Sequence, residues 1–293
     1  MNTRDLDYFK ILVDKKSFTE AAIACHVSQP TITAAIKRLE KEFAVKLIER
    51  DRIHQRLHVT RAGKILYQSA TAIQLKLTNT QKELAATAQR EIRFGLPPII
   101  GTAYLPQLAE KLQQLSLLSL IKITETGSNA LLKKILNGEI DLALMASPKP
   151  LTYSDLKAKI IGRRPFCIAV SPKSHLASLN QIAFADLADE QFIGVTAQYV
   201  HLKVFQNFCK YAAINPHIVY SAPDISWVKG LVRANLGVAL LADDAILPTD
   251  QLHKIYLTDP YPERFNISIV QRQEYVLSEA ETQLVAELSK MNV

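Results

Sequence analysis

The fold of the first part of this 293-residue chain is decided by two short stretches, Ser17-Phe18-Thr19-Glu20-Ala21-Ala22 and Val27-Ser28-Gln29-Pro30-Thr31-Ile32-Thr33. Ser17 and Glu20 have the spacing of a capping box, which predicts the start of a short, alanine-rich helix. Ser28 is a favourable cap for a second helix, and Pro30 is tolerated in its first turn. Two helices joined by the three-residue turn Cys25-His26-Val27 predict a helix-turn-helix.

The second of these helices has one apolar and one polar side. Its apolar residues are spaced by four, three and four positions, which predicts a single buried stripe of Ile32, Ile36, Leu39 and Phe43. The other side begins with amide and hydroxyl groups that suit base edges in the major groove of DNA and continues with cations that suit phosphates. A merely solvated face is the ordinary alternative, but the capped helix and the short turn before it favour DNA. The expected DNA contacts are Ser28, Gln29, Pro30, Thr31, Thr33, Lys37 and Arg38.

The flanking segments complete this module. Thr3 is the predicted cap of an earlier amphipathic helix. Alternating apolar residues in 45–50 and 56–60 predict a hairpin, or wing. His54 and His58 are four positions apart without a third ligand nearby, so we expect no metal site. Around the wing tip, three arginines are placed to contact the phosphate backbone or minor groove: Arg50, Arg52 and Arg56.

The distribution of charge agrees with a nucleic-acid partner. Residues 1–93 carry 17 Lys and Arg against 10 Asp and Glu, whereas residues 94–293 carry 18 of each, so the first third holds the whole excess of +7. Residues 1–58 account for only +3 of this charge, and the rest lies in residues 59–93. The positive electrostatic field is therefore expected to extend along the DNA past the wing. A basic polyanion-binding module joined to a neutral domain is therefore expected.

A long helix is expected to follow the wing. Residues 60–89 contain no proline, and apolar or small residues recur at the heptad spacing Leu66, Ala70, Ile73, Leu77, Thr80 and Leu84. Such a seam pairs with another helix, either in a second copy of the chain or in its own chain. The expected dimerisation residues are Leu66, Ile73, Leu77 and Leu84.

The residues of this first part resemble the winged helix-turn-helix of LysR-type transcriptional regulators. Besides the two stretches quoted first, the matches are Ile36-Lys37-Arg38-Leu39-Glu40-Lys41-Glu42, the step from Leu47 to Arg50, and Thr60-Arg61-Ala62-Gly63. Ile48 stands where the family usually has Phe, and Ala34 where Arg is frequent. The resemblance implies a DNA-binding domain at 1–60, a linker helix at 61–89 that forms a homodimer or homotetramer, and an effector-binding domain at 90–293.

The neutral remainder alternates between strand and helix patterns. Strands are expected near 92–96, 120–125, 141–145, 166–170, 192–195, 218–220 and 238–241, with helices across 105–115, from 127, and near 202–212 and 227–234. This pattern predicts an α/β domain with a mostly parallel sheet covered on both faces. Its motifs resemble the two-lobed effector domain of the same family, which is similar to a periplasmic binding protein. The resemblance implies one lobe at about 90–161 and 267–293 and a second at about 162–266.

Helix starts at the cleft between such lobes suit small anions. The residues expected to contact an effector there are Pro98, Ile99, Thr102, Gly127, Ser128, Val195 and Thr196. Ser128 matches a ligand-contacting hydroxyl of the family, although it could instead only cap its helix. Pro97-Pro98 replaces hydroxyl residues that are common in the family and removes two N–H donors.

Other classes of protein fit less well. No phosphate-binding loop, dinucleotide-binding glycine motif, metalloprotease helix or nucleophile elbow occurs, so we expect neither an enzyme nor a bound cofactor. The three cysteines are far apart, no apolar run is long enough to cross a membrane, and no signal peptide precedes the basic front; these features favour a cytoplasmic protein over a secreted solute-binding protein. Leu39–Phe43 and Arg50–His54 resemble malolactic-fermentation regulators within the family, which implies an activator that responds to L-malate.

Overall fold

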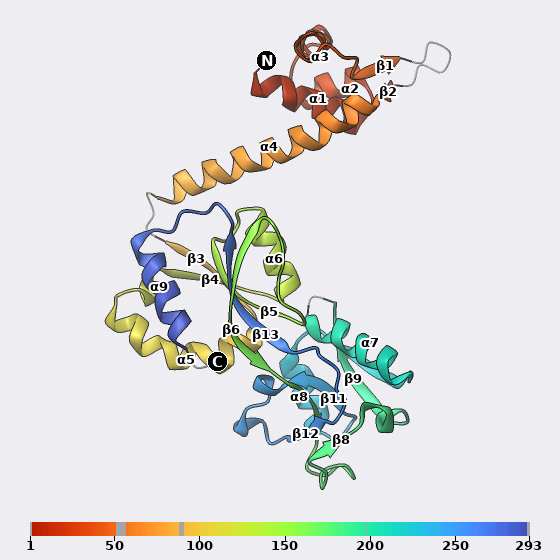
Figure 1. Cartoon of the computed structure of the whole chain (residues 1–293), viewed down its shortest axis with the longest axis vertical. Helices are drawn as coiled ribbons and strands as arrows, with labels where there is room; N and C mark the ends of the chain where they lie inside the picture. The colour runs from red at the N-terminus through yellow and green to blue at the C-terminus, as the bar shows by residue number, and fades with distance from the viewer. Residues whose placement is uncertain (1, 51–56, 88–90, 198, 292–293) are drawn as a thin grey trace. The chain divides into compact units, whose positions relative to one another are not determined.

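The computed structural model describes residues 2–50, 57–87, 91–197 and 199–291. The chain forms two compact units, Met1–Ala88 and Gln89–Val293, each with its own hydrophobic core. The first unit contains α1 (Thr3–Lys15), α2 (Phe18–Ala24), α3 (Gln29–Phe43), the antiparallel strands β1 (Ile48–Arg50) and β2 (Leu57–Val59), and the long helix α4 (Arg61–Ala86) (Figure 1). These elements make the expected winged helix-turn-helix, and the capped starts of α2 and α3 lie where the sequence predicts them. Helix α4 is capped by Thr60, whose side chain accepts from the Gly63 amide.

The start of α1 differs from the expectation. Asn2, not Thr3, is the cap: its side chain accepts a hydrogen bond from the Asp5 amide at 2.9 Å, and Asp5 accepts one from the Asn2 amide in return. A cap at Thr3 would have placed Leu6 at the position that closes a capping box. Because only Asn2 has a carboxylate three residues later, the helix starts one residue earlier than predicted.

Three elements meet where the wing joins the long helix. On α3, Glu40 accepts hydrogen bonds from the Leu47 amide at 2.9 Å, the Ile48 amide at 3.4 Å and Lys46 Nζ at 2.9 Å. Burial opposes ionisation of Glu40, but these hydrogen bonds lower its pKa. Gly63 in α4 packs directly on Leu47, because a Cβ atom at Gly63 would lie 2.3 Å from the Leu47 carbonyl oxygen. A glycine is therefore required at this position.

The first lobe of the second unit is built on a five-stranded sheet. The strand order is β4 (Ile121–Glu125), β3 (Ile92–Leu96), β5 (Leu142–Ser147), β13 (Phe265–Arg272) and β6 (Leu156–Arg164). Only β4, β3 and β5 are parallel; β13 runs antiparallel to both of its neighbours. The expectation of a mostly parallel sheet is therefore wrong. The sheet is mixed because the chain leaves this lobe along β6 and returns along β13.

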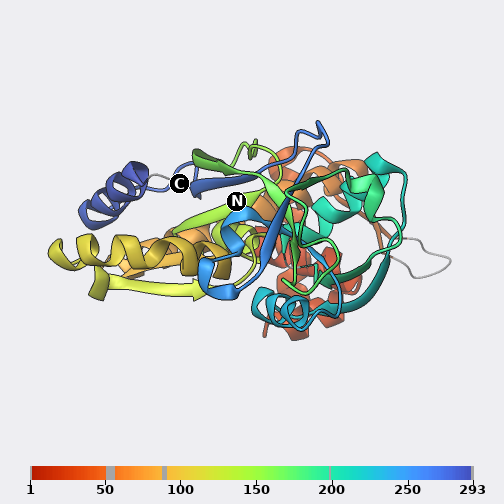
Figure 2. The ribbon, with the colours of Figure 1, turned by 90° about the horizontal axis from the view of Figure 1, so that it is seen from below.

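Helices cover both faces of this sheet, as expected. Helices α5 (Pro98–Gln114) and α9 (Glu279–Lys290) lie side by side on one face, and α6 (Ser128–Leu136) lies on the other (Figures 1 and 2). Successive residues of β5 point to opposite faces: Leu144 packs with the α5 side, whereas Met145 packs with the α6 side. Helix α5 begins at Pro98, seven residues before the predicted start, because Pro97-Pro98 opens the helix as well as ending the strand.

The second lobe contains two small sheets. The first has the order β11 (Ala239–Ala242), β7 (Phe166–Val170), β12 (His253–Leu257) and β8 (Gln181–Ile182), and in the second β9 (Gln191–Val195) pairs in parallel with β10 (His217–Ala222). Helices α7 (Val200–Ala212) and α8 (Ile225–Arg233) pack on them. The described residues of this unit also form the 3-10 turns η1 (Leu118–Leu120), η2 (Phe184–Leu187), η3 (Asp243–Ala245) and η4 (Pro248–Asp250).

Candidate functional site

The exposed side of α3 presents the expected DNA-contacting residues. Ser28 caps the helix, its hydroxyl lies 2.8 Å from that of Thr31, and the Thr33 hydroxyl donates to the Gln29 carbonyl at 3.1 Å. These bonds stabilise the first turn. The side chains of Gln29 and Lys37, eight positions apart, are exposed and make no hydrogen bond within the described structure. Pro30 is exposed in the first turn. Gln29 and Lys37 are therefore free to contact DNA on one face of the helix.

Arg38 is engaged within the chain. Its guanidinium donates two hydrogen bonds to Asp5 of α1, from Nε at 3.1 Å and from Nη2 at 2.5 Å. Asp5 is almost fully buried, and the hydrogen bonds from Arg38 lower the pKa of its carboxyl. Arg38 thus joins α3 to α1, a structural role that the sequence pattern did not indicate.

The predicted wing contacts are described only in part. Arg52, Arg56 and the side chain of Arg50 lie outside the described residues, and so does His54. The two strands of the wing pair with Ile48 opposite Val59 and Glu49 opposite His58.

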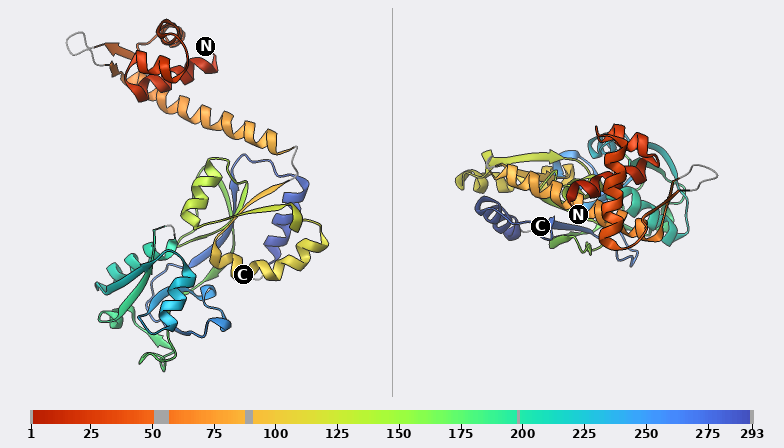
Figure 3. Two further views of the ribbon diagram at one scale, coloured as in Figure 1. Left: turned by 180° about the vertical axis from the view of Figure 1, so that it is seen from behind. Right: turned by 90° about the horizontal axis from the view of Figure 1, so that it is seen from above.

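The predicted seam of α4 divides into two parts. Ala70 is buried in the core of the first unit, with Leu66 packed against that core. Further along, Ile73, Leu77 and Leu84 have 42%, 43% and 65% of their surface exposed. Helix α1 packs against the beginning of α4, and Figure 3 shows that α4 continues well past the rest of this unit. Packing within the chain therefore explains the first part of the seam and leaves the second part exposed.

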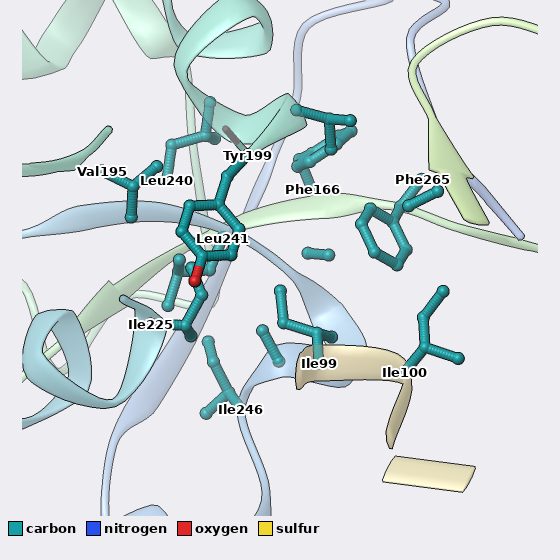
Figure 4. Packing of buried hydrophobic residues seen from close by; sticks show 14 of the residues in the cluster. Ile99, Ile100, Phe166, Val195, Tyr199, Ile225, Leu240, Leu241, Ile246 and Phe265 are labelled. Atoms are coloured by element: carbon teal, nitrogen blue, oxygen red, sulfur yellow. The ribbon is translucent and has the colours of Figure 1, made fainter. Parts of the chain in front are cut away.

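Between the lobes of the second unit lies a small, mainly apolar pocket. Three predicted effector residues line it, Pro98, Ile99 and Ser128. Tyr199, Phe265 and neighbouring apolar side chains fill the surrounding space (Figure 4). The remaining volume, about 10 Å³, accommodates roughly one water molecule. A metabolite would require these side chains to move apart.

The other predicted effector residues lie outside this pocket. Thr102 and Thr196 are exposed, and the Thr196 amide donates to the Ala222 carbonyl at 3.2 Å. Gly127 is the cap residue of α6, and Val195 lines a separate apolar pocket of the second lobe. Of the seven predicted effector residues, three therefore line this pocket and four do not.

The three helices that begin at the pocket lack side-chain caps. Helices α5, α6 and α7 start after Pro97, Gly127 and Tyr199, and none of these residues provides a capping hydrogen bond. The alternative role considered for Ser128, capping its own helix, is therefore wrong. Its hydroxyl oxygen instead accepts from the Ala146 amide at 2.9 Å, which leaves its O–H available to donate.

His201, in the first turn of α7, is a pocket residue that the sequence analysis did not single out. It is 2% exposed, its Nε2 accepts from the Ala242 amide at 3.2 Å, and burial lowers its pKa to about 4. The ring is therefore neutral near pH 7, and because Nε2 accepts, Nδ1 carries the proton. Nδ1 has no hydrogen-bond partner among the described residues. A single histidine on a mostly apolar helix gives no sequence signal of this role.

A polar network joins the two lobes beside the apolar contact. Asp244 of η3 accepts hydrogen bonds from Tyr104 of α5 and from Arg164 at the end of β6, the latter with both Nε–O distances at 3.2 Å. Burial and this carboxylate raise the pKa of Tyr104. The neighbouring Asp243 accepts from Lys254 and Tyr256 at 3.0 and 2.9 Å. The bonds that Tyr104 and Arg164 donate to Asp244 oppose separation of the lobes, whereas those of Asp243 lie within the second lobe.

Three further observations concern the chemistry of the described part of the chain. No group of three His, Cys, Asp or Glu side chains there could hold a metal ion. None of its helices is long and apolar enough to cross a membrane. Burial raises the pKa of each cysteine thiol, and that of Cys167 reaches about 12.

Two family models match the chain. The model of the bacterial regulatory helix-turn-helix protein, lysR family, covers residues 3–64, and that of the LysR substrate binding domain covers residues 85–292. The chain therefore belongs to the LysR family and is a DNA-binding transcriptional regulator with an effector-binding domain. The resemblance found in the sequence is confirmed.

Individual relatives agree with this assignment. The malolactic fermentation system transcriptional activator of Lactococcus lactis subsp. lactis (strain IL1403) is 31% identical over 282 residues, 96% of each chain. The dual regulator OxyR of Escherichia coli (strain K12) is 28% identical over 252 residues, 85% of this chain and 81% of the relative. These relatives are transcriptional regulators, and regulators of this family act as oligomers.

Solved structures share the fold. A C206 mutant of Corynebacterium glutamicum OxyR aligns with a TM-score of 0.58 at 23% identity, over 99% of this chain and 91% of the other. The effector-binding domain of QuiR in complex with shikimate aligns with a TM-score of 0.59 at 16% identity, over 67% of this chain and 94% of the other.

Proposed function

We propose that this regulator reads a specific DNA site with the exposed face of α3 and the wing. Gln29 would contact base edges, with Ser28, Pro30, Thr31 and Thr33 forming the first turn that carries it into the major groove. Lys37, and the wing residues Arg50, Arg52 and Arg56, would contact phosphates. The free, exposed side chains of Gln29 and Lys37 support this assignment.

Two copies would pair through α4. The exposed end of the seam, Ile73, Leu77 and Leu84, offers apolar side chains at heptad spacing, whereas Leu66 serves mainly the core of its own unit. A homodimer or a tetramer formed from dimers would place two recognition helices on the two halves of one DNA site.

The cleft would bind a small organic anion. The observation that supports this is the meeting of three helix starts without side-chain caps around one pocket, together with the unpaired N–H of buried His201. Free amides, the positive ends of the helix dipoles, and the hydroxyl of Ser128 all favour an anionic oxygen. The similarity to a malolactic fermentation activator supports L-malate as the first compound to test. Such a regulator would act in the cytoplasm and, by analogy, as an activator.

Thermal unfolding of the full chain with a panel of small carboxylates tests this proposal. A ligand at about 100 times its Kd adds about 2.7 kcal/mol to the free energy of unfolding, a shift that is easily measured. We expect L-malate or a related carboxylate to stabilise the wild type, and His201→Gln to bind it less tightly while remaining folded. If no carboxylate stabilises the wild type, or if His201→Gln binds equally well, the proposed effector class is wrong.

A further inference from the structure

A second, larger groove lies next to the cleft pocket and has a different chemical character. It has a volume of about 360 Å³, within the range of small-molecule sites. It is lined by the start of α6, by residues 145–153 at and after the end of β5, by one face of α7, and by Glu263 just before β13. Unlike the cleft pocket, it is lined by charged side chains, Lys149, Lys203 and Glu263.

Glu263 is the central feature of this groove. Its side chain is 2% exposed; Oε1 accepts a hydrogen bond from Asn207 Nδ2 at 2.7 Å, but Oε2 has no hydrogen-bond partner among the described residues. Burial, the charge of Glu263 and side-chain hydrogen bonding to Glu263 raise the pKa of the Tyr261 phenol. A buried carboxyl with one unsatisfied oxygen is costly unless a donor reaches it.

Two other acceptors line the same groove. Ser147, at the end of β5, is 5% exposed, and its hydroxyl has no partner among the described residues. Asn207 uses its NH2 group for Glu263, which leaves its carbonyl oxygen to accept. Glu263 Oε2, Ser147 Oγ and Asn207 Oδ1 thus make three acceptors, which match the three N–H donors of an ammonium group.

The rim and walls of the groove complete a binding site. Lys149 and Lys203 line it, are exposed, and form no ion pair within the described structure. Lys203 lies one turn before Asn207 on the same face of α7. Leu132, Leu151 and Val200 provide apolar walls.

We propose that this groove binds a small zwitterion, namely an α-amino acid. Its ammonium would donate to Glu263, Ser147 and Asn207, its carboxylate would face Lys203 and Lys149, and its side chain would contact the apolar walls. A simple dicarboxylate is excluded from this position because it would bring negative charge to Glu263 without a donor. The groove adjoins the anion site proposed at His201 and shares part of its wall, including Ser128, but the ammonium position at Glu263 lies outside that pocket. Because α6 and α7 belong to different lobes, a ligand in the groove would link them.

Binding of L-amino acids and of their 2-hydroxy acid analogues to the full-length protein tests the proposal. Each pair differs only in the ammonium group; L-aspartate and L-malate form one such pair. We expect at least one amino acid, and not its hydroxy acid, to raise the Tm and to give a Kd by calorimetry. Equal binding of both members of every pair, or the absence of binding by any amino acid, would overturn the proposal.

Two variants locate the site. Glu263→Gln should raise the Kd for the amino acid by about tenfold or more, without lowering the Tm of the unliganded protein, since it removes a buried, half-satisfied carboxyl. Lys203→Gln should weaken binding, whereas Lys210→Gln, at a position on α7 that does not line the groove, should not. A lower Tm for Glu263→Gln with an unchanged Kd would assign Glu263 a structural role and overturn the proposal. Because Glu263→Gln leaves His201 intact, this variant should still be stabilised by the carboxylates that stabilise the wild type. The amino acid proposal and the carboxylate proposal can therefore be disproved independently of each other.

Discussion

The helices of the DNA-binding unit and the helices that begin at the effector cleft differ in the capping of their N-termini. In the DNA-binding unit, side chains of Asn2, Ser17, Ser28 and Thr60 cap all four helices, whereas α5, α6 and α7 begin at the cleft without such caps. The absence of side-chain caps is a feature of the helix starts at the cleft and not of the whole effector unit. Helices α8 and α9, which begin away from the pocket, are capped by Asp224 and Ser278. Caps complete a helix within its own chain; their absence at the cleft leaves donors for a ligand.

The same contrast appears among buried and half-buried side chains. Glu40 and Asp5, in the DNA-binding unit, have their carboxylates satisfied by neighbours in the chain. His201 Nδ1 and Glu263 Oε2, in the effector unit, have no such partner among the described residues. In these examples, the DNA-binding unit satisfies its carboxylates within the chain, whereas the effector unit leaves one donor and one acceptor without a partner among the described residues.

The largest effect on stability is expected from a substitution in the core of the DNA-binding unit. Gly63→Ala would place a Cβ 2.3 Å from the Leu47 oxygen and 2.8 Å from Val59 Cγ1, which should destabilise the first unit by about 3 kcal/mol. Urea unfolding followed by circular dichroism measures the loss, and hydrogen exchange shows whether it falls in residues 2–50. Gly230→Ala in α8 is the control: its Cβ would meet no atom within 4 Å, so stability should rise by about 0.5–1 kcal/mol. Equal effects of the two changes would contradict the close packing at Gly63.

A fall in pH should lower the folding stability of the effector unit through His201. Its pKa falls from 6.5 to about 4 on burial, so between these values the unfolded chain binds a proton that the folded chain does not. Stability is therefore lost as the pH falls, by at most about 1.4 kcal/mol per unit and by between about 1 and 2 kcal/mol in total from pH 6.5 to 5. Urea unfolding followed by the fluorescence of Trp227, the single tryptophan, should show this slope in the wild type and a smaller one in His201→Gln. The same slope in both proteins would show that other groups cause it.

The seam of α4 gives a matched pair of substitutions. Leu75 and Leu77 are each 43% exposed, but only Leu77 lies at the heptad spacing. A charge at Leu77, in Leu77→Glu, should weaken dimerisation by about tenfold or more, equivalent to about 1.4 kcal/mol. Leu75→Glu should have little effect. Sedimentation over a range of concentrations distinguishes the two variants, and equal dissociation of both would place the dimer contact elsewhere.

Local signals explain what the sequence could predict. The starts of α3 and α4 follow from Ser28, Pro30 and Thr60, since a cap acts within one turn of its own helix. Strand β6 was missed because it lies at the edge of its sheet, and its exposed lysines and arginines give it no apolar run. Nor could the sequence reveal His201 and Glu263, because their importance comes from burial by segments distant in the chain.

The smallest effect is expected from replacing Lys37, and it distinguishes this residue from the adjacent Arg38 on α3. Lys37 is free within the described structure, whereas Arg38 is tied to buried Asp5. Lys37→Ala should therefore weaken DNA binding alike for all sequences and reduce the slope of log K against log salt by about 1, with no change in Tm. Arg38→Ala removes the partner of a buried carboxylate, so its Tm should fall even without DNA. Gel-shift titrations at several salt concentrations and thermal unfolding give the two readouts. If Arg38→Ala left the Tm unchanged and altered only the salt slope, Arg38 would be a phosphate contact, as its position in the sequence first indicated, and its pairing with Asp5 would contribute nothing to the fold.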